Sequence, residues 1–186
     1  MMIRPARESD AAALLAIYAP FVEHTAYSFE YEVPSEAEFR RRIRETTAQF
    51  PWLVCEEDGE LLGYAYGSPA FSRRAYGFLC ELSVYLGEGA RHKGLGRRLY
   101  GLCEEILRRQ GYCRIYCVVT SENEASCRFH EALGYRNMTV FQNSGLKFGR
   151  WYSTVWYEKV LSEAVPAEFP RPWRELRLDD LLPEKN

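Results

Sequence analysis

Apolar residues near the start of the chain recur every three to four positions in two segments, and this spacing predicts two helices. The first covers residues 11–18, with Ser9 as its expected N-cap. The second follows a capping-box pattern at residues 35–38 and places Phe39 and Ile43 on one face. It also carries a basic face, expected to be solvated, made of Arg40, Arg41, Arg42 and Arg44.

After residue 50 the pattern changes to alternation and short apolar runs, which are typical of strands. Runs at residues 52–55 and 61–66 flank Asp58-Gly59, a dipeptide that favours a tight hairpin turn. A long strand is expected over residues 76–86. Shorter strands are expected over residues 2–4, 112–119, 135–142 and 151–160.

Two more helices alternate with these later strands. One is amphipathic, begins after a Gly-rich stretch at residues 87–94 and ends at Gly111, and the other covers residues 123–133 and stops at Gly134. This order of elements predicts an α/β fold, with a mixed, largely antiparallel central sheet flanked by helices.

The chain divides into one domain and a tail. A length of 186 residues is typical of a single domain, which we place at residues 1–162. Residues 163–186 hold four prolines and many charges, so this Pro-rich C-terminal extension is expected to lie outside the core.

Composition and charge narrow the classes of function. The chain has 24 basic and 26 acidic residues, a net charge of −2, which predicts no nucleic-acid and no membrane partner. No apolar run approaches the ~20 residues that span a bilayer, and the N-terminus lacks a signal-peptide pattern. The six cysteines form no Cys-x-x-Cys pair and are expected to be buried thiols, with no metal site. These features predict a cytoplasmic protein.

A run of glycines and cations follows the long strand, with the sequence Arg91-His92-Lys93-Gly94-Leu95-Gly96-Arg97-Arg98. Backbone N–H groups at a helix start are unpaired and the helix dipole favours anions there, so the run is suited to bind a pyrophosphate. Glycine at positions 94 and 96 would let phosphates approach the backbone, and the neighbouring cations would add charge. A plain glycine turn with solvated arginines is the alternative.

The pattern Arg91-x-x-Gly94-x-Gly96 at a strand-to-helix junction resembles the acetyl-CoA pyrophosphate motif of the GNAT acetyltransferase superfamily. Asn123, Ser126 and residues 130–135 resemble its next cofactor motif. More narrowly, the chain resembles phosphinothricin N-acetyltransferases and their relatives that act on methionine sulfone and sulfoximine. That resemblance spans residues 2–161 and rests on segments at 51–54, 73–76, 81–85, 130–135 and 147–151.

The resemblance implies an N-acetyltransferase that uses acetyl-CoA and a small amino-acid-like amine. A protonated amine cannot attack a thioester, and Glu81 is the expected base because burial in an apolar strand would raise its pKa. His130 is the second expected catalytic residue, either donating a proton or only contacting the cofactor. The implied cofactor contacts are Val84, Tyr85, Leu86, Arg91, His92, Lys93, Gly94, Leu95, Gly96, Arg97, Asn123 and Ser126.

The acceptor is expected to bind at the loop before the long strand. Arg73 and Arg74 in this loop are suited to pair with a carboxylate or phosphinate, with Tyr76 beside them. Phe29 and Phe71 are expected to line the pocket, with ordinary core packing as the alternative. The resemblance further implies that Lys147 contributes to the acceptor pocket and that the chain forms a homodimer.

Two alternatives stay open from the sequence. The first is an acetyltransferase for another small amine or a protein N-terminus; the arginines at 73 and 74 argue against a cationic polyamine. The second is an acyl-CoA-binding module without catalysis, which would have no need of a carboxylate at Glu81. The sequence does not identify the physiological acceptor.

Overall fold

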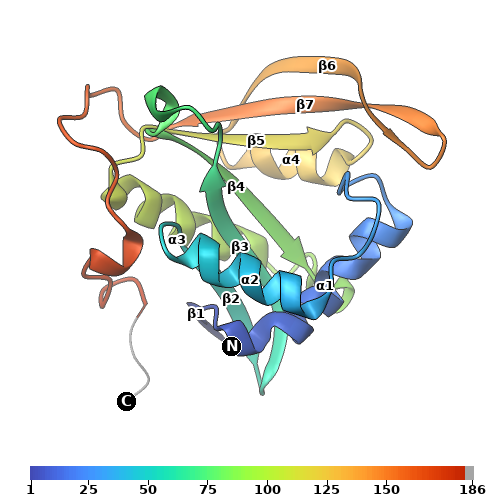
Figure 1. Ribbon diagram of the computed structural model, residues 1–186, viewed down its shortest axis with the longest axis horizontal. Coiled ribbons are helices and arrows are strands. Elements are labelled where there is room, and N and C mark those ends of the chain that lie inside the picture. Colours follow the sequence, from blue (N-terminus) through green and yellow to red (C-terminus); the bar gives the residue numbers. More distant parts are fainter. Residues whose placement is uncertain (183–186) are drawn as a thin grey trace.

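The structure of the chain, a computed structural model, describes residues 1–182. It contains a seven-stranded sheet in the order β1-β2-β3-β4-β5-β7-β6 (Figure 1). The strands are β1 (Met2–Pro5), β2 (Trp52–Glu57), β3 (Glu60–Pro69), β4 (Leu79–Leu86), β5 (Arg114–Thr120), β6 (Arg136–Lys147) and β7 (Arg150–Val160). The helices are α1 (Ala11–His24), α2 (Glu36–Thr47), α3 (Leu95–Gln110) and α4 (Glu124–Ala132). The α/β fold expected from the sequence is confirmed.

The neighbouring strands β4 and β5 run parallel, whereas the other neighbours in the sheet run antiparallel. Their ladder is short, because residues 79–81 face residues 114–116 and the pairing ends there. On the outer sides, β3 pairs with β4 as far as Leu86 and β7 pairs with β5 as far as Thr120. The sheet therefore opens between β4 and β5 beyond Glu81, and this opening positions the site.

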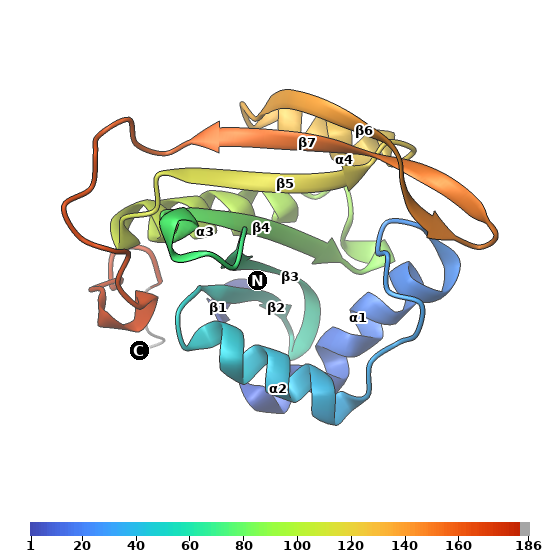
Figure 2. The same ribbon diagram turned by 45° about the horizontal axis from the view of Figure 1, so that its top comes forward.

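Helices cover both faces of the sheet, with α1 and α2 on one side and α3 on the other (Figure 2). Strand alternation divides the core accordingly. Trp52 and Val54 pack with residues of α1 and α2, while Leu53 packs with residues of α3. On β4 the same alternation buries Leu82 beneath α3 and turns Glu81 toward the opposite face.

The helix starts agree only in part with the sequence. Ser35 is the N-cap of α2, and its hydroxyl accepts from the Glu38 N–H at 3.2 Å, but the Glu38 carboxylate binds arginines instead of completing the box. Ser9 is not the cap of α1. It lies inside a 3-10 turn over residues 8–10, whose Asp10 carboxylate accepts from the Arg7 N–H at 2.7 Å, and α1 begins after that turn.

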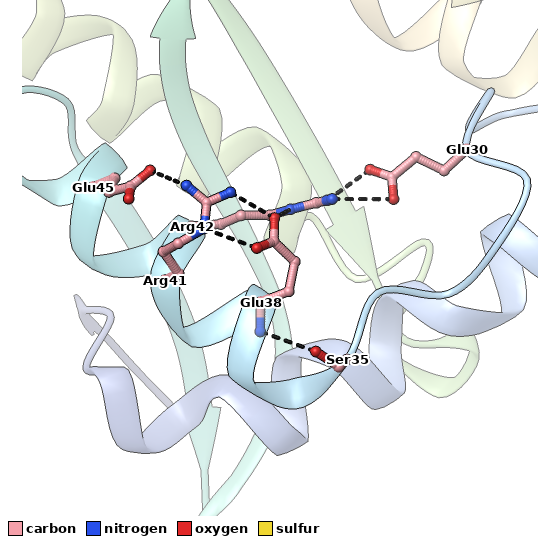
Figure 3. A network of polar contacts seen from close by, with 6 residues as sticks. All are labelled: Glu30, Ser35, Glu38, Arg41, Arg42 and Glu45. Atoms are coloured by element: carbon pink, nitrogen blue, oxygen red, sulfur yellow. Dashed lines mark hydrogen bonds and ion pairs between the residues drawn. The ribbon is translucent and has the colours of Figure 1, made fainter.

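The arginines of α2 are exposed except for Arg42, which is half-buried, and they are also paired with carboxylates. Arg41 and Arg42 both bind Glu38, and Arg41 also binds Glu45 (Figure 3). Hydrogen bonds from the two arginines lower the pKa of Glu38 to about 2. Arg42 reaches further, to Glu30, with Nη1 and Oε1 2.6 Å apart. This pair ties α2 to the segment that follows α1.

Glycines and turns end several elements where the sequence places them, but β3 continues past residue 66 to Pro69 and β6 continues past residue 142 to Lys147. Asp58 and Gly59 have φ of 51° and 85°, which makes the tight hairpin turn between β2 and β3. Gly111 ends α3 with φ of 105°. The start of β4 also differs from the expected residue 76: it lies at Leu79 because residues 74–76 form a 3-10 turn.

The C-terminal segment returns to the domain, which corrects the expectation that it lies outside the core. It runs from the end of β7 toward the C-terminal end of α3 (Figure 1). Trp173 is only 3% exposed, and its indole N–H donates to the Thr47 carbonyl at 3.0 Å. The Gln110 amide donates to the Arg171 carbonyl at 2.8 Å. Trp173 thus fixes the segment to the domain, and the leucines at 176, 178, 181 and 182 pack against the same core.

None of the helices within residues 1–182 combines the length and apolarity that crossing a bilayer requires. Across the same described residues, His, Cys, Asp and Glu side chains form no group of three or more arranged to hold a metal ion.

Candidate active site

A cleft lies where β4 and β5 separate. Residues 81–85 form its β4 side and residues 117–120 form its β5 side. Beyond Glu81 the backbone groups of β4 that point toward β5 have no ladder partner, so an extended polar ligand has N–H and C=O groups to pair with. The other lining residues are Phe21, Tyr27, Tyr100, Asn123, Ser126 and His130. The cleft brings together six of the residues singled out from the sequence, namely Glu81, Val84, Tyr85, Asn123, Ser126 and His130.

Glu81 is a carboxylate in a largely apolar setting. Its Cα lies opposite Ser68 on β3 and Tyr116 on β5, at the point where the parallel ladder ends. Burial alone raises its pKa, because no cation or hydrogen-bond donor within residues 1–182 offsets the loss of solvent. A carboxylate with a raised pKa is a better proton acceptor for an amine than an exposed one.

His130 is 3% exposed and is held by hydrogen bonds at both ring nitrogens. Its Nδ1 lies 2.8 Å from the Ser126 carbonyl, which can only accept, so Nδ1 carries the proton and Nε2 accepts. The Tyr100 hydroxyl lies 2.9 Å from Nε2 and 2.9 Å from the Leu82 carbonyl and shares its proton between them. Burial lowers the pKa of His130, so the ring is neutral at pH 7.

The Tyr100–His130 network binds the Leu82 carbonyl, which is the first carbonyl of β4 beyond its ladder with β5. In a continuous sheet the Leu82 carbonyl would pair with β5; here it accepts instead from the Tyr100 hydroxyl and from the Cys117 thiol at 3.4 Å. His130 holds Tyr100 in place. The pair therefore stabilises the separation of β4 from β5.

Replacing Tyr100 with Phe is expected to lower the free energy of unfolding by about 1–2 kcal/mol, because the Leu82 carbonyl and His130 Nε2 each lose a buried partner. Urea denaturation measures the change. A variant within about 0.3 kcal/mol of the wild type would show that the hydroxyl does not support the opening.

The glycine–cation run forms the N-terminal end of α3. Gly94 is the N-cap with φ of 76°, and only open space surrounds the position of an added Cβ. The first helical bond here runs from the Arg98 N–H to the Gly94 carbonyl at 3.2 Å, so the N–H groups of residues 95–97 point out of the helix end. His92, with φ of 61°, and Lys93 are exposed on the same turn. Free N–H groups, the helix dipole and cations together make an anion site.

Two residues of this run serve packing, which corrects part of the expectation. Leu95 is 2% exposed and belongs to the core, so only its backbone is available to a ligand. Gly96 is buried too: an added Cβ would lie 3.3 Å from the Phe129 ring and 3.5 Å from the Leu86 side chain. Glycine at 96 is therefore needed for the close approach of Phe129 and Leu86.

The remaining predicted cofactor residues divide between the cleft and its surroundings. Leu86 and Arg91 line a groove beside α1, where the Arg91 guanidinium covers the Phe21 ring at 5.5 Å. Asn123 caps α4, and its side-chain oxygen accepts from the Ser126 N–H at 3.2 Å. Asn123 and Ser126 both line the cleft. Arg97 is exposed beside α4 and donates to its C-terminal end at 3.4 Å.

Phe71 and Tyr76 form an exposed aromatic pair on the face of the sheet that carries Glu81. Their ring centroids are 4.8 Å apart, and Phe71 lies 6.1 Å from Tyr116, the residue opposite Glu81. Arg73 is exposed on the adjoining turn. The loop before β4 thus places apolar rings and a cation on the side of Glu81.

Lys147 is buried at the end of β6, which corrects the expectation that it binds the acceptor. Its Nζ donates to the carbonyl oxygens of Val22, Thr25 and Ser28 at 2.7, 2.8 and 2.7 Å, so all three of its protons have partners. Burial lowers its pKa. The ammonium joins the C-terminal end of α1 and the segment after it, residues 25–31, to the β6–β7 hairpin.

The hairpin holds this segment at further points, and both ribbon views show its tip beside the segment (Figures 1 and 2). The Phe29 ring covers Gly145 so closely that an added Cβ would clash with it. The Tyr31 hydroxyl donates to the Leu146 carbonyl. Tyr27, in the same segment, lines the cleft. Phe29 therefore packs on the hairpin, whereas Tyr27 forms part of the site.

Replacing Lys147 with Met is expected to lower the free energy of unfolding by about 3 kcal/mol, because three carbonyls lose their donor. For a chain of this length the melting temperature should fall by about 6–12 °C. Arg128→Met, which removes only an exposed ion pair with Glu124, is the control and should change little. Equal thermal stability of the two variants would contradict the assigned role of Lys147.

Three aromatic residues of the cleft, Phe21, Tyr27 and Tyr100, were not identified from the sequence. Tyr100 is part of the buried stripe of α3, and a hydroxyl on an apolar stripe is the one signal that could have marked it. Phe21 belongs to an apolar helix face. Tyr27 lies in a segment without periodicity, so no pattern points to it.

Residues 3–156 match the family described as Acetyltransferase (GNAT) domain. The phosphinothricin N-acetyltransferase of Alcaligenes faecalis is 39% identical over 165 residues, covering 86% of this chain and 82% of that protein. The L-methionine sulfoximine/L-methionine sulfone acetyltransferase of Salmonella typhimurium is 32% identical over 164 residues, covering 88% of this chain and 96% of that protein.

The fold agrees with these matches. A GNAT superfamily phosphinothricin acetyltransferase from Sinorhizobium meliloti, solved in complex with acetyl-CoA, superposes with a TM-score of 0.84 at 32% identity, over 91% of this chain and 92% of that one. The opening between β4 and β5, the anion site at the start of α3 and these similarities lead to one conclusion: the chain belongs to the GNAT family of acetyltransferases.

Proposed function

We propose that this acetyltransferase transfers the acetyl group of acetyl-CoA to the amine of a small amino-acid-like acceptor, of the phosphinothricin or methionine sulfoximine/sulfone type. The observation that carries the proposal is Glu81, a half-buried carboxylate with a raised pKa at the point where the cleft opens. A module that only bound acyl-CoA would have no use for a base there. Relatives named for these acceptors support the choice of substrate class.

The reaction follows from this placement. Glu81 takes a proton from the acceptor ammonium, directly or through a water molecule, and the freed amine attacks the thioester carbonyl. A C–N bond forms, the C–S bond breaks, and the sulfur leaves as a thiolate, which takes up the second proton that the nitrogen loses. His130 is neutral and engaged with Tyr100, so we assign it a positioning role rather than that of the acid.

The chain has groups that fit acetyl-CoA along one path. The N–H groups of residues 95–97, with Lys93 and Arg97 nearby, fit its pyrophosphate. Val84 and Tyr85 lie where β4 no longer pairs with β5, and this part of the strand fits the amide-bearing arm, with a β4 backbone N–H on the β5 side available to the thioester oxygen. The arm so placed leads from the anion site toward Glu81.

The acceptor approaches Glu81 from the loop before β4. Arg73 supplies a cation for an acceptor carboxylate or phosphinate, and Phe71 and Tyr76 supply an apolar wall. This arrangement favours an anionic amino acid over a polyamine, because a cation would be repelled by the arginine.

Release of free coenzyme A thiol tests the proposal across phosphinothricin, methionine sulfoximine, methionine sulfone, a polyamine and a test peptide. Thiol release with the amino-acid analogues alone is the expected result. Release only with the peptide or polyamine would assign the chain to another acceptor. Tight acetyl-CoA binding without release in any sample would favour a non-catalytic binding module.

We also propose that the chain works as a homodimer through its β6 edge. Along this edge strand Met138, Val140 and Phe141 are exposed, and Trp151 on β7 is 58% exposed. An edge strand with exposed apolar side chains favours pairing with another chain. Light scattering should give twice the chain mass. The six cysteines, all free, support a cytoplasmic location.

A further inference from the structure

The C-terminal segment contacts the loop that precedes β4, although the two are about ninety residues apart in sequence. Its fixed point is the stretch around Trp173. The Arg171 N–H donates to the Gln110 carbonyl at 3.1 Å, the Trp173 N–H donates to the Gln49 carbonyl at 3.2 Å, and the Gln49 amide donates to the Pro170 carbonyl at 3.1 Å. Phe169 immediately precedes this stretch, so the hydrogen bonds of residues 170–173 determine the backbone position of Phe169.

The Phe169 ring packs on three successive parts of the loop. It stacks on Phe78 with the ring centroids 4.7 Å apart and an interplanar angle of 18°. It covers Gly77, where an added Cβ would lie 2.9 Å from the ring. The Arg74 guanidinium also lies over the Phe169 ring, 4.9 Å from the ring centroid. One side chain of the C-terminal segment therefore fixes both the backbone and a cation of the loop.

The same loop forms the acceptor side of the site. Arg73 precedes Arg74 directly, and Tyr76 contacts Phe71. β4 begins at Leu79, directly after Phe78, and contains Glu81. With Arg74 held over Phe169, Arg73 is the neighbouring cation left for an acceptor anion. The conformation of residues 73–78 thus decides how Arg73 and Tyr76 stand relative to Glu81.

We infer that Phe169 is a positioning residue for the acceptor: through Arg74, Gly77 and Phe78 it sets the loop that binds the acceptor anion beside Glu81. The inference rests on the proposed function for the location of the acceptor. It gives the C-terminal segment a role in substrate binding that leaves acetyl-CoA binding untouched, because the anion site at the start of α3 shares no contact with Phe169.

The test replaces Phe169 with Ala and with Tyr, and uses Val165→Ala as the control because Val165 is 95% exposed in the same segment. Phe169→Ala should raise the acceptor KM about 5- to 10-fold, as expected for loss of one cation–π contact and one ring stack. The KM for acetyl-CoA should stay unchanged. Phe169→Tyr keeps the ring and should restore the wild-type acceptor KM, and Val165→Ala should behave as wild type.

Hydrogen exchange of residues 73–78 provides a readout that needs no substrate. Faster exchange in Phe169→Ala, but not in Phe169→Tyr or Val165→Ala, is the expected result. Unchanged exchange, an unchanged acceptor KM, or an equal rise of both KM values would overturn the inference. If the wild type turned over no amino-acid acceptor, the proposed function would fail, and the exchange experiment would still decide whether Phe169 holds the loop.

Discussion

Replacing Glu81 with Gln should reduce kcat by about 10²- to 10⁴-fold, the usual contribution of a general base. Glutamine has nearly the same shape but cannot take the proton of the acceptor amine. The affinity for acetyl-CoA should not change, because the anion site lies at the start of α3 and does not include this side chain. Steady-state turnover and calorimetric binding of acetyl-CoA measure the two quantities separately.

The pH dependence gives the same residue a second test. A base works only when ionised, so activity should fall as the pH drops through the pKa of Glu81. Since burial raises this pKa, the acid limb of kcat/KM should lie above 4.5, the ordinary value. Glu81→Gln should lack that limb, while Glu36→Gln, a change on the exposed face of α2, should keep it. An identical acid limb in Glu81→Gln would assign the base to another group.

Replacing Gly94 with Glu should weaken acetyl-CoA binding by about 10²-fold or more. The new carboxylate would stand in the open space in front of the free N–H groups of residues 95–97, where like charges repel by several kcal/mol. The φ of 76° at this position adds strain for any residue with a Cβ. Isothermal titration with acetyl-CoA measures the loss.

Two controls separate charge from strain and from helix stability. Gly94→Ala carries the strain without the charge and should bind far better than Gly94→Glu. Gly101→Glu adds the same carboxylate to α3 at another glycine with open space around it, and should leave binding intact. Normal acetyl-CoA binding by Gly94→Glu would remove the anion site from this account.

The sequence predicts most of the fold because each element carries its own local signal. The apolar run at residues 52–55, the Asp58-Gly59 turn and the glycine after α3 all depend on residues close in sequence. The β4-to-α3 junction carries two such signals, an apolar strand that holds Glu81 and a glycine–cation run. Local patterns therefore indicate both the proposed base and the proposed anion site.

Long-range contacts account for what the sequence does not predict. The sequence predicts that Lys147 binds a ligand, but its ammonium donates to three carbonyls at the end of α1 and in the segment after it. Trp173 is buried because α2 and α3 leave a place for it, which no pattern in the tail indicates. Gly96 and Tyr100 likewise acquire their roles from partners distant in sequence, Phe129 and Leu82 respectively. The sequence shows the types of these residues but does not indicate which partners they contact.

Mass spectrometry of the acceptor after incubation with acetyl-CoA tests the central claim most directly. With phosphinothricin or methionine sulfone, the wild type should place one acetyl group on the amine nitrogen, and Glu81→Gln should yield little or none in the same time. Recovery of every amino-acid acceptor unmodified, from an enzyme shown to bind acetyl-CoA, would contradict the account.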